Sequence, residues 1–208
     1  MEISRDCVQG SEEWKLLRLG KVTASRIADV MTKVKSGEAA ARRNYRAELV
    51  CQLLTGESQE NFCTTDMQRG LDLEPFARAA YEVKTGMLVD QVAFVPHPSI
   101  DRASASPDGL IGEDGLVEIK CPKTANHIDY LLGKVPPTQY QPQMLWQMAC
   151  TGRQWCDFVS YCPDLPEPLQ LFVVRFPRDN GRIEEMEKEV TQFNAEVDEI
   201  ITKLRAIK

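Results

Sequence analysis

Alternating apolar and polar positions predict a β-hairpin at the centre of the chain, over residues 106–120. The segment 112–115 reads Gly-Glu-Asp-Gly, and glycine supplies the positive φ that tight turns require. Side chains alternate along a strand, so Glu118 and Lys120 share one face, and Val117 and Ile119 point to the other. The turn folds the first strand back, which can bring Asp108 beside this pair.

The remaining elements follow from the spacing of apolar positions, at three and four residues for helices and in short runs for strands. The predicted helices cover 12–19, 23–31, 39–54, 65–85, 139–150 and 183–207, and further strands cover 88–95, 155–161 and 169–176. The core-facing side chains of the long fourth helix are predicted to be Leu71, Phe76, Ala80 and Tyr81. This order predicts an α/β fold, in which a mixed central β-sheet is flanked by helices on both faces.

Length and composition point to one domain spanning 1–208, with no internal repeat and no long linker. No apolar run approaches the ~20 residues of a membrane span, and the N-terminus lacks the apolar core of a signal peptide. The seven cysteines contain no Cys-x-x-Cys pair, so reduced thiols and a cytoplasmic location are expected. With two histidines, a His-rich metal site is poorly supported.

Charge is distributed unevenly, although the net charge is −6. Residues 15–48 hold nine Lys and Arg against three acids, whereas residues 183–208 hold seven acids against four Lys and Arg. A basic N-terminal face beside an acidic C-terminal helix can hold a polyanion locally. Solvated helix faces explain the same pattern equally well.

The hairpin carries the first candidate chemistry. Two carboxylates and an ammonium at one end of a small sheet suit a hard, oxygen-ligated cation such as Mg²⁺. A surface hairpin with solvated charges is the alternative from these residues alone.

Two further groups of polar residues accompany the hairpin. Thr23 and Ser25 open a helix, where hydroxyls and free N–H groups can bind phosphate, and Arg18 lies just upstream. A structural helix cap is the alternative for the two hydroxyls. Downstream, Tyr140, Gln143 and Gln147 lie on one side of a helix, where they can hold substrate or form an ordinary polar face.

Several blocks occur in one order along residues 9–153. They are Gln9-Gly10 with Trp14 and Leu17-Arg18-Leu19-Gly20, Thr23-Ala24-Ser25, Gly70 with Glu74, Ser106-Pro107-Asp108-Gly109-Leu110, Glu118-Ile119-Lys120-Cys121-Pro122, and Tyr140-x-Pro142-Gln143 through Thr151-Gly152-Arg153. Together they resemble the phage lambda-type exonucleases, the YqaJ-like viral recombinase branch of the PD-(D/E)XK nucleases. The resemblance implies a restriction-endonuclease-like core in a single lambda-exonuclease-like domain.

The resemblance also implies a catalytic centre that binds two Mg²⁺ ions, with Mn²⁺ as a possible substitute. Asp108, Glu118 and the carbonyl of Ile119 would bind the metal, and Glu74 would add a carboxylate that orients metal-bound water. Lys120 would position or deprotonate the attacking water, or stabilise charge in the transition state.

Substrate contacts are implied in the same way. Arg18, Ser25 and Ser106, with Thr23, would form a pocket for a 5′-phosphate. Tyr140 and Gln143 would line the site around the scissile phosphate. The weaker matches are Met67, as an apolar wedge that splits the terminal base pair, and Lys35, as a basic side chain that follows the duplex.

By resemblance, the protein is expected to be a phage- or prophage-encoded enzyme of a bacterial host. It would be a processive 5′→3′ exonuclease that acts on double-stranded DNA ends as a homotrimeric ring and leaves a 3′ strand for a single-strand annealing protein in recombination. One alternative is a PD-(D/E)XK endonuclease or RecB-like repair nuclease without ring threading. Another, of a different class, is a non-catalytic DNA-end-binding adaptor.

Overall fold

Two β-sheets form the framework of the chain in the computed structural model, which describes residues 4, 5, 7–58 and 64–207. The larger sheet has the order β2-β5-β6-β7-β8, and only its β6–β7 pair is parallel. Its strands are β2 (Val89–Asp90), β5 (Gly109–Ile111), β6 (Gly115–Lys120), β7 (Trp155–Tyr161) and β8 (Leu171–Pro177). The smaller sheet places β4 (Ala103–Ala105) between β1 (Val22–Thr23) and β3 (Val95–Pro96). Both sheets are mixed, as expected.

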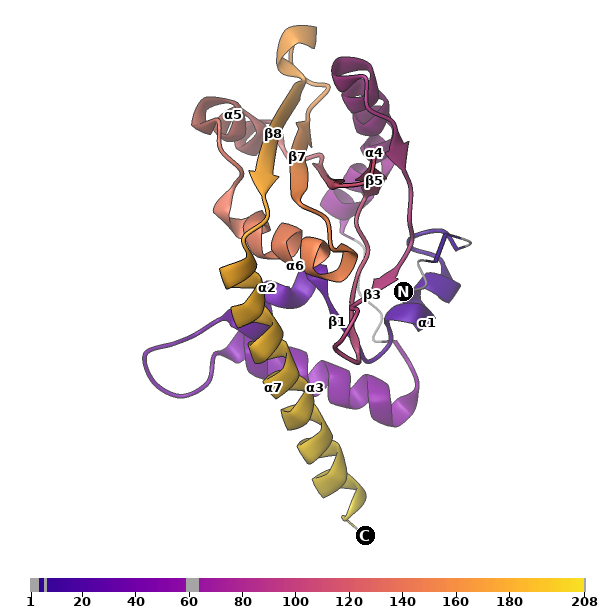
Figure 1. Ribbon diagram of the computed structural model, residues 1–208, viewed down its shortest axis with the longest axis vertical. Coiled ribbons are helices and arrows are strands. Elements are labelled where there is room, and N and C mark those ends of the chain that lie inside the picture. The colour runs from indigo at the N-terminus through magenta and orange to yellow at the C-terminus, as the bar shows by residue number, and fades with distance from the viewer. Residues whose placement is uncertain (1–3, 6, 59–63, 208) are drawn as a thin grey trace.

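Helices cover both faces of the larger sheet (Figure 1). They are α1 (Glu12–Arg18), α2 (Ile27–Met31), α3 (Ala40–Thr55), α4 (Thr65–Thr85), α5 (Thr124–Gly133), α6 (Gln141–Thr151) and α7 (Asn180–Arg205), with short 3₁₀ turns at Ala24–Arg26, Thr138–Tyr140 and Glu167–Leu169. No described helix is both long enough and apolar enough to cross a membrane. The predicted arrangement of a sheet between helical layers is therefore confirmed.

Strand β6 lies in the middle of the larger sheet and separates two hydrophobic cores. Val117 and Ile119 pack with Ala77 and Tyr81 of α4 on one face. Leu116 points to the other face, into the larger core that includes α2, α3, α6 and α7. Alternation along β6 therefore leaves Glu118 on the side of the larger core, as the sequence pattern predicts.

The tip of the hairpin is fixed by close packing and by one arginine. A Cβ at Gly115 would overlap the indole ring of Trp155, so this position has no room for a larger residue. The Nη1 of Arg153 donates to the carbonyls of Ile111, Gly112 and Gly115 at 3.1, 2.8 and 2.8 Å. These three bonds join both strands of the hairpin to the end of α6.

The predicted strand over 88–95 is wrong as a single element. The segment divides into β2, which pairs with β5 of the larger sheet, and β3, which pairs with β4 of the smaller one. The chain changes sheets between them, and an apolar run does not reveal which partner each half takes.

Helix α5 was not predicted. Pro122 and Pro136 bracket it, and Lys123 provides no side-chain cap for its first turn, so the usual start signal is missing. The helix is held instead by its buried His127, whose Nδ1 lies 2.6 Å from the Ser160 hydroxyl and whose Nε2 lies 2.8 Å from the Leu169 carbonyl.

The core-facing side of α4 is narrower than predicted. Ala77 and Tyr81 are buried, one turn apart, and Ala80 is partly buried. Leu71 and Phe76 are exposed, Phe76 to 64%. The helix lies on the sheet along a single stripe, so its other apolar residues remain on the surface.

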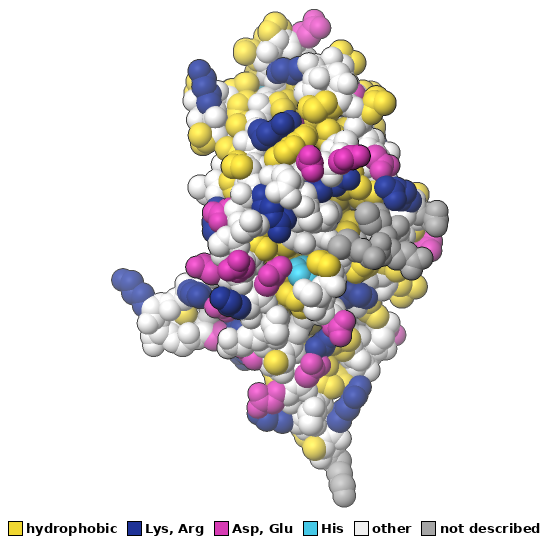
Figure 2. Space-filling view, viewed as in Figure 1, with side chains coloured by type: hydrophobic (Ala, Val, Ile, Leu, Met, Phe, Trp, Pro, Cys, Tyr) yellow, Lys and Arg dark blue, Asp and Glu magenta, His cyan; other side chains and the backbone are white. Residues whose placement is uncertain are grey.

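The acidic helix α7 neutralises much of the basic N-terminal segment. Arg42 donates two hydrogen bonds to Glu196, at 2.6 and 2.9 Å, and Arg46 donates one at 2.6 Å. Lys33 pairs with Glu189 at 3.1 Å. Basic and acidic side chains are interleaved along the face shown in Figure 2. The charge pattern therefore reflects internal ion pairs as well as solvated faces.

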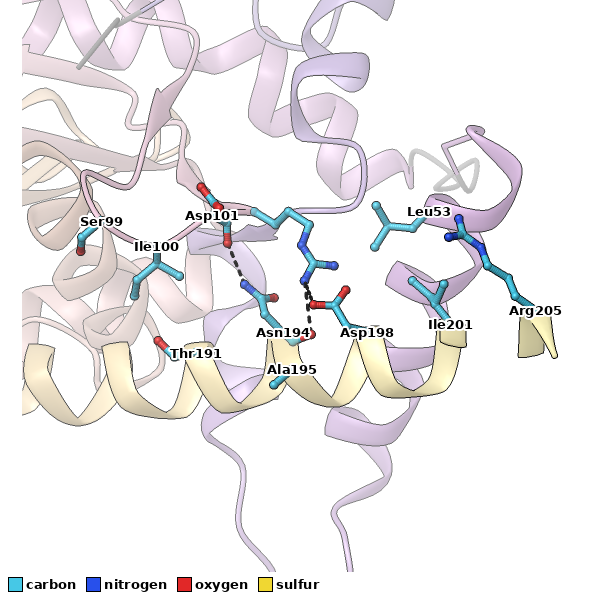
Figure 3. Close-up of a pocket in the computed structure, with 11 residues that line it drawn as sticks. Leu53, Ser99, Ile100, Asp101, Thr191, Asn194, Ala195, Asp198, Ile201 and Arg205 are labelled. Carbon is cyan, nitrogen blue, oxygen red and sulfur yellow. Dashed lines mark hydrogen bonds and ion pairs between the residues drawn. The ribbon is translucent and has the colours of Figure 1, made fainter. Parts of the chain in front are cut away.

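Helix α7 is also bonded to the turn between β3 and β4. A pocket of about 610 Å³ lies between them (Figure 3). Across it, the Asn194 amide donates to the Asp101 carbonyl at 2.8 Å, and Arg102 pairs with Asp198 at 2.6 Å. Arg102 has a left-handed backbone, with φ of 55°. None of the residues predicted for catalysis or phosphate binding lines this pocket.

Candidate active site

The carboxylates of Asp108 and Glu118 are brought together by the hairpin. Asp108 comes directly before β5, and its Oδ2 accepts a hydrogen bond from the backbone N–H of Ile119 at 2.6 Å. This bond ties Asp108 to the strand residue next to Glu118. The convergence predicted from the sequence is therefore present in the structure.

Glu118 is a fully buried carboxylate, with 0% of its surface exposed. Its Oε1 accepts from the Gln143 amide at 2.6 Å and also contacts the ammonium of Lys120. Its Oε2 accepts from the Gln147 amide at 2.6 Å. A buried carboxylate is costly unless it is paired and hydrogen-bonded, so α6 and β6 together make this position tenable.

Electrostatic coupling within this group is strong. Burial raises the pKa of Asp108 well above its usual value, and the nearby Glu118 and Glu74 carboxylates add to the effect. Burial opposes the charged form of Lys120, but the negative charges of Glu118 and Asp108 outweigh it and raise the pKa of Lys120. The site thus concentrates negative charge around a single ammonium.

This donor set suits a hard divalent cation. Asp108, Glu118 and the Ile119 carbonyl are oxygen ligands of the kind that Mg²⁺ prefers. Within the described residues, no cluster of three or more His, Cys, Asp or Glu side chains is arranged to hold a metal ion. Glu74 is close enough to influence the pKa of Asp108, but its carboxylate bonds to Arg78 at 3.1 Å. The carboxylates of Asp108 and Glu118 are thus the candidate ligands that the hairpin brings together, and Glu74 lies near enough to Asp108 to act on its charge.

Tyr140 borders the same site. The Lys120 ammonium lies 5.3 Å from the centroid of its ring, and the ring stacks on Phe158 at a centroid distance of 5.4 Å. Tyr140, Gln143 and Gln147 lie on one side of the segment that contains α6, as predicted. All three are near Glu118 or Lys120.

A second cluster gathers Arg18 and three hydroxyl groups from separate parts of the chain. Arg18 Nη1 donates to Ser106 Oγ at 3.2 Å, and Nη2 donates to Ser25 Oγ at 3.4 Å. The hydroxyls of Thr23 and Ser25 lie 3.4 Å apart. All four residues predicted for phosphate binding therefore meet at one place.

Arg18 forms no ion pair with any carboxylate in the described part of the chain. Burial lowers the pKa of Arg18 to about 10, which leaves it charged at neutral pH. A partly buried guanidinium held only by neutral groups attracts an anion. The helix predicted over 23–31 divides into the 3₁₀ turn Ala24–Arg26 and α2, which has only five residues, so no long helix begins at this cluster.

The two clusters are adjacent. Ser106 belongs to the arginine cluster and Asp108 to the carboxylate pair, with only Pro107 between them. Two residue steps span at most about 7 Å between Cα atoms. An anion held by Ser106 is therefore close to the carboxylates.

The other two predicted contacts lie apart from these clusters. Met67 is 53% exposed in the first turn of α4, and it lies seven residues, or two turns, before Glu74. Lys35 is exposed in the loop between α2 and α3. No contact of either residue with the two clusters is present among the described interactions.

Two further side chains contribute to the site. The sequence leaves Gln147 with either a substrate-holding role or an ordinary polar position, and its four-residue spacing from Gln143 is the available signal. Trp14 donates its indole N–H to Ser106 Oγ at 3.1 Å and to the Ala93 carbonyl at 3.0 Å. A hydrogen bond between residues 92 positions apart has no counterpart in local sequence spacing.

Comparisons with known proteins agree with the geometry. The chain is similar to an alkaline exonuclease (LHK-Exo) from Laribacter hongkongensis, with 53% identity and a TM-score of 0.88 over 94% of this chain and 96% of that one. It is similar, at 52% identity, the same TM-score and the same coverage, to LHK-Exo in complex with dAMP.

A phage related exonuclease from Haemophilus somnus 129PT shares the fold, with 16% identity and a TM-score of 0.73 over 88% of this chain and 96% of that one. No curated protein matches the chain. The model of the YqaJ-like viral recombinase domain matches residues 13–154, which include both clusters. The chain belongs to the YqaJ-like viral recombinase family.

Proposed function

We propose that this protein is a Mg²⁺-dependent exonuclease that degrades one strand of linear double-stranded DNA in the 5′→3′ direction, beginning at a 5′-phosphate. The proposal rests on one observation: Arg18, which has no ion-pair partner among the described residues, bonds to Ser106, and Ser106 lies two residues before Asp108 of the carboxylate pair. A pocket for a terminal phosphate beside a cleavage site sets the cut a short, fixed distance from the strand end. One relative of known structure is an alkaline exonuclease, and a structure of it in complex with dAMP, a mononucleotide, is known.

Each cluster contributes a separate part of the chemistry. Asp108, Glu118 and the Ile119 carbonyl would hold the metal. Bound Mg²⁺ supplies Lewis-acid chemistry, because it neutralises phosphate charge and makes water more acidic. The Lys120 ammonium would stabilise negative charge that develops on the scissile phosphate or position the attacking water. Gln143 and Tyr140 would line the path of that phosphate.

DNA would be held mainly by Arg18 with Ser25, Ser106 and Thr23. The α3 arginines contribute less than the sequence suggested, because Arg42 and Arg46 are already paired with α7. We assign Met67 as an apolar wedge at the terminal base pair and Lys35 as a contact to the duplex backbone, as the family resemblance implies.

A homotrimeric ring would make digestion processive by keeping the duplex threaded. Exposed apolar side chains on and after α4 favour association of subunits; they are Leu71, Phe76, Val83 and Leu88. The 3′ strand left by digestion would pass to a single-strand annealing protein during recombination in the cytoplasm of the bacterial host. Sedimentation as a monomer with undiminished processivity would contradict the ring.

The chemistry is tested by substitutions at the hairpin. Lys120→Ala and Asp108→Asn are expected to abolish hydrolysis of 5′-phosphorylated duplex while duplex binding persists. EDTA should stop the wild-type enzyme and added Mg²⁺ should restore it. Asp114→Asn removes a carboxylate at the exposed turn of the same hairpin and should leave the rate unchanged. Near-normal turnover in Lys120→Ala or Asp108→Asn would remove that residue from the mechanism.

A further inference from the structure

Ser106 lies between two side chains that can only donate hydrogen bonds. Its Oγ is 3.1 Å from the indole Nε1 of Trp14 and 3.2 Å from Nη1 of Arg18. Indole and guanidinium groups have no hydrogen-bond acceptor, whereas a hydroxyl has two lone pairs and one hydrogen. Ser106 must therefore accept both bonds, and its own hydrogen must point to a third group.

No acceptor for the Ser106 hydrogen is present among the described residues. Both lone pairs of the oxygen are occupied, so the hydroxyl is left as a donor only. An anion is the natural partner of such a donor, since hydrogen bonds to charged groups are the strong ones. Trp14 thus fixes both the position of the Ser106 hydroxyl and the direction in which its hydrogen points.

Trp14 also supports the arginine. The guanidinium carbon of Arg18 lies 4.1 Å from the centroid of the indole ring, a stacking distance that favours the cation and limits its movement. Trp14 is itself fixed, because its backbone N–H donates to the Ser11 hydroxyl at 3.2 Å and its indole N–H is shared with the Ala93 carbonyl. One side chain, anchored by these bonds, therefore orients two donors of the anion pocket.

We propose that Trp14 is a positioning residue that makes the enzyme selective for 5′-phosphorylated ends, by holding Ser106 as an obligate donor and Arg18 in place. This inference rests on the proposed role of the Arg18 cluster as a 5′-phosphate pocket. The proposed role of Trp14 affects which DNA ends are bound, and the residues of the hairpin still carry out cleavage.

Trp14→Phe separates the two contributions of this side chain, because it keeps an aromatic ring near Arg18 while it removes the indole N–H together with part of the ring volume. Ser106 then has a free lone pair, and its hydrogen is no longer forced toward the phosphate. We expect kcat/KM on 5′-phosphorylated duplex to fall about tenfold or more, in line with a weakened bond to a charged group. On the same duplex with a 5′-hydroxyl, we expect less than a twofold change.

A double-mutant cycle shows whether Trp14 acts through Ser106. Ser106→Ala alone and Trp14→Phe with Ser106→Ala should have nearly the same selectivity, because the second change has no hydroxyl left to orient. The affinity for both duplexes, measured by fluorescence anisotropy in EDTA, gives a readout that does not depend on turnover.

Trp155→Phe is the matched control. Trp155 also supports an arginine, with Arg175 3.4 Å from its ring centroid, but it lies outside the Arg18 cluster. It should leave the preference between the two ends unchanged. Trp14→Phe would overturn the inference if it reduced activity on both ends equally, which indicates packing, or if it kept the preference intact. A wild-type enzyme with no preference for 5′-phosphate would instead refute the pocket in the proposed function.

Discussion

Substitution of Gln147 is predicted to change the activity of the enzyme far more than its stability. Its amide nitrogen donates to Glu118 Oε2 at 2.6 Å, while its amide oxygen is buried without a hydrogen-bond partner in the described residues. Gln147→Met preserves the volume and removes both polar atoms. The two consequences for the free energy of unfolding therefore have opposite signs.

Their magnitudes are similar. Losing a hydrogen bond to a charged group costs about 1.5–3 kcal/mol, and removing an unpaired buried acceptor returns about 1–3 kcal/mol. The net change should lie within about 1 kcal/mol, or roughly 2–4 °C in Tm for a chain of this length. Activity has no such compensation, because Oε2 of Glu118 loses its amide donor. Loss of a residue that orients a metal ligand typically costs about 10–100-fold in metal affinity or activity.

The assay is the rate on 5′-phosphorylated duplex as a function of Mg²⁺, with Tm and calorimetric Mg²⁺ binding measured on the same preparations. Gln52→Met is the matched control, since Gln52 is also buried, makes no hydrogen bond to Glu118, and has both ends of its amide bonded, to Gly20 and Glu48. It should lose about 1–3 kcal/mol of stability and keep its activity. Full activity in Gln147→Met, or a loss of stability as large as that of Gln52→Met, would refute the reasoning.

Three further predictions follow from other contacts. Arg18→Ala should slow digestion of 5′-phosphorylated ends about tenfold or more and spare 5′-hydroxyl ends, since the proposed partner of the guanidinium is the terminal phosphate; an equal loss on both would count against the pocket. Arg153→Met should lower the free energy of unfolding by about 2 kcal/mol, measured by urea titration, because it removes three hydrogen bonds that close the hairpin; an unchanged midpoint would disprove this role. Glu196→Gln should lower stability at neutral pH by roughly 1 kcal/mol, because hydrogen bonds from Arg42 hold the pKa of Glu196 below its usual value. The difference in stability between Glu196→Gln and the wild type should be complete above the ordinary carboxyl pKa of about 4.5, and it should vanish as the pH falls through the lowered pKa of Glu196. Glu199→Gln, which removes a charge from an exposed ion pair, should change stability little at any pH.

Much of the fold was predictable because its signals are local. Glycines 112 and 115 with alternating side chains predict the hairpin, and the apolar spacing of 65–85 gives the bounds of α4 as the structure has them. The sequence pattern does not show which strand or core surface each apolar segment will pack against. The division of 88–95 between two sheets, and the exposure of Phe76, depend on what lies opposite each residue.

The candidate site divides in the same way. The carboxylates follow from strand alternation, and Arg18, Thr23 and Ser25 are grouped by their nearness in the sequence. Ser106 joins them only through the family resemblance, because no spacing rule brings it to Arg18. The neutralisation of Arg42 and Arg46 by Glu196 joins residues 150 or more positions apart. The donor-only environment of Ser106 likewise exists only once α1 lies against the strands.

Digestion of end-labelled linear duplex with Mg²⁺ tests the central claim most directly. Three substrates are compared: duplex labelled at the 5′ end, the same duplex labelled at the 3′ end, and a closed circle. A 5′→3′ exonuclease should release the 5′ label at once as a mononucleotide, retain the 3′ label in a long single strand, and leave the circle intact. Early release of the 3′ label, or cutting of the circle, would contradict the account.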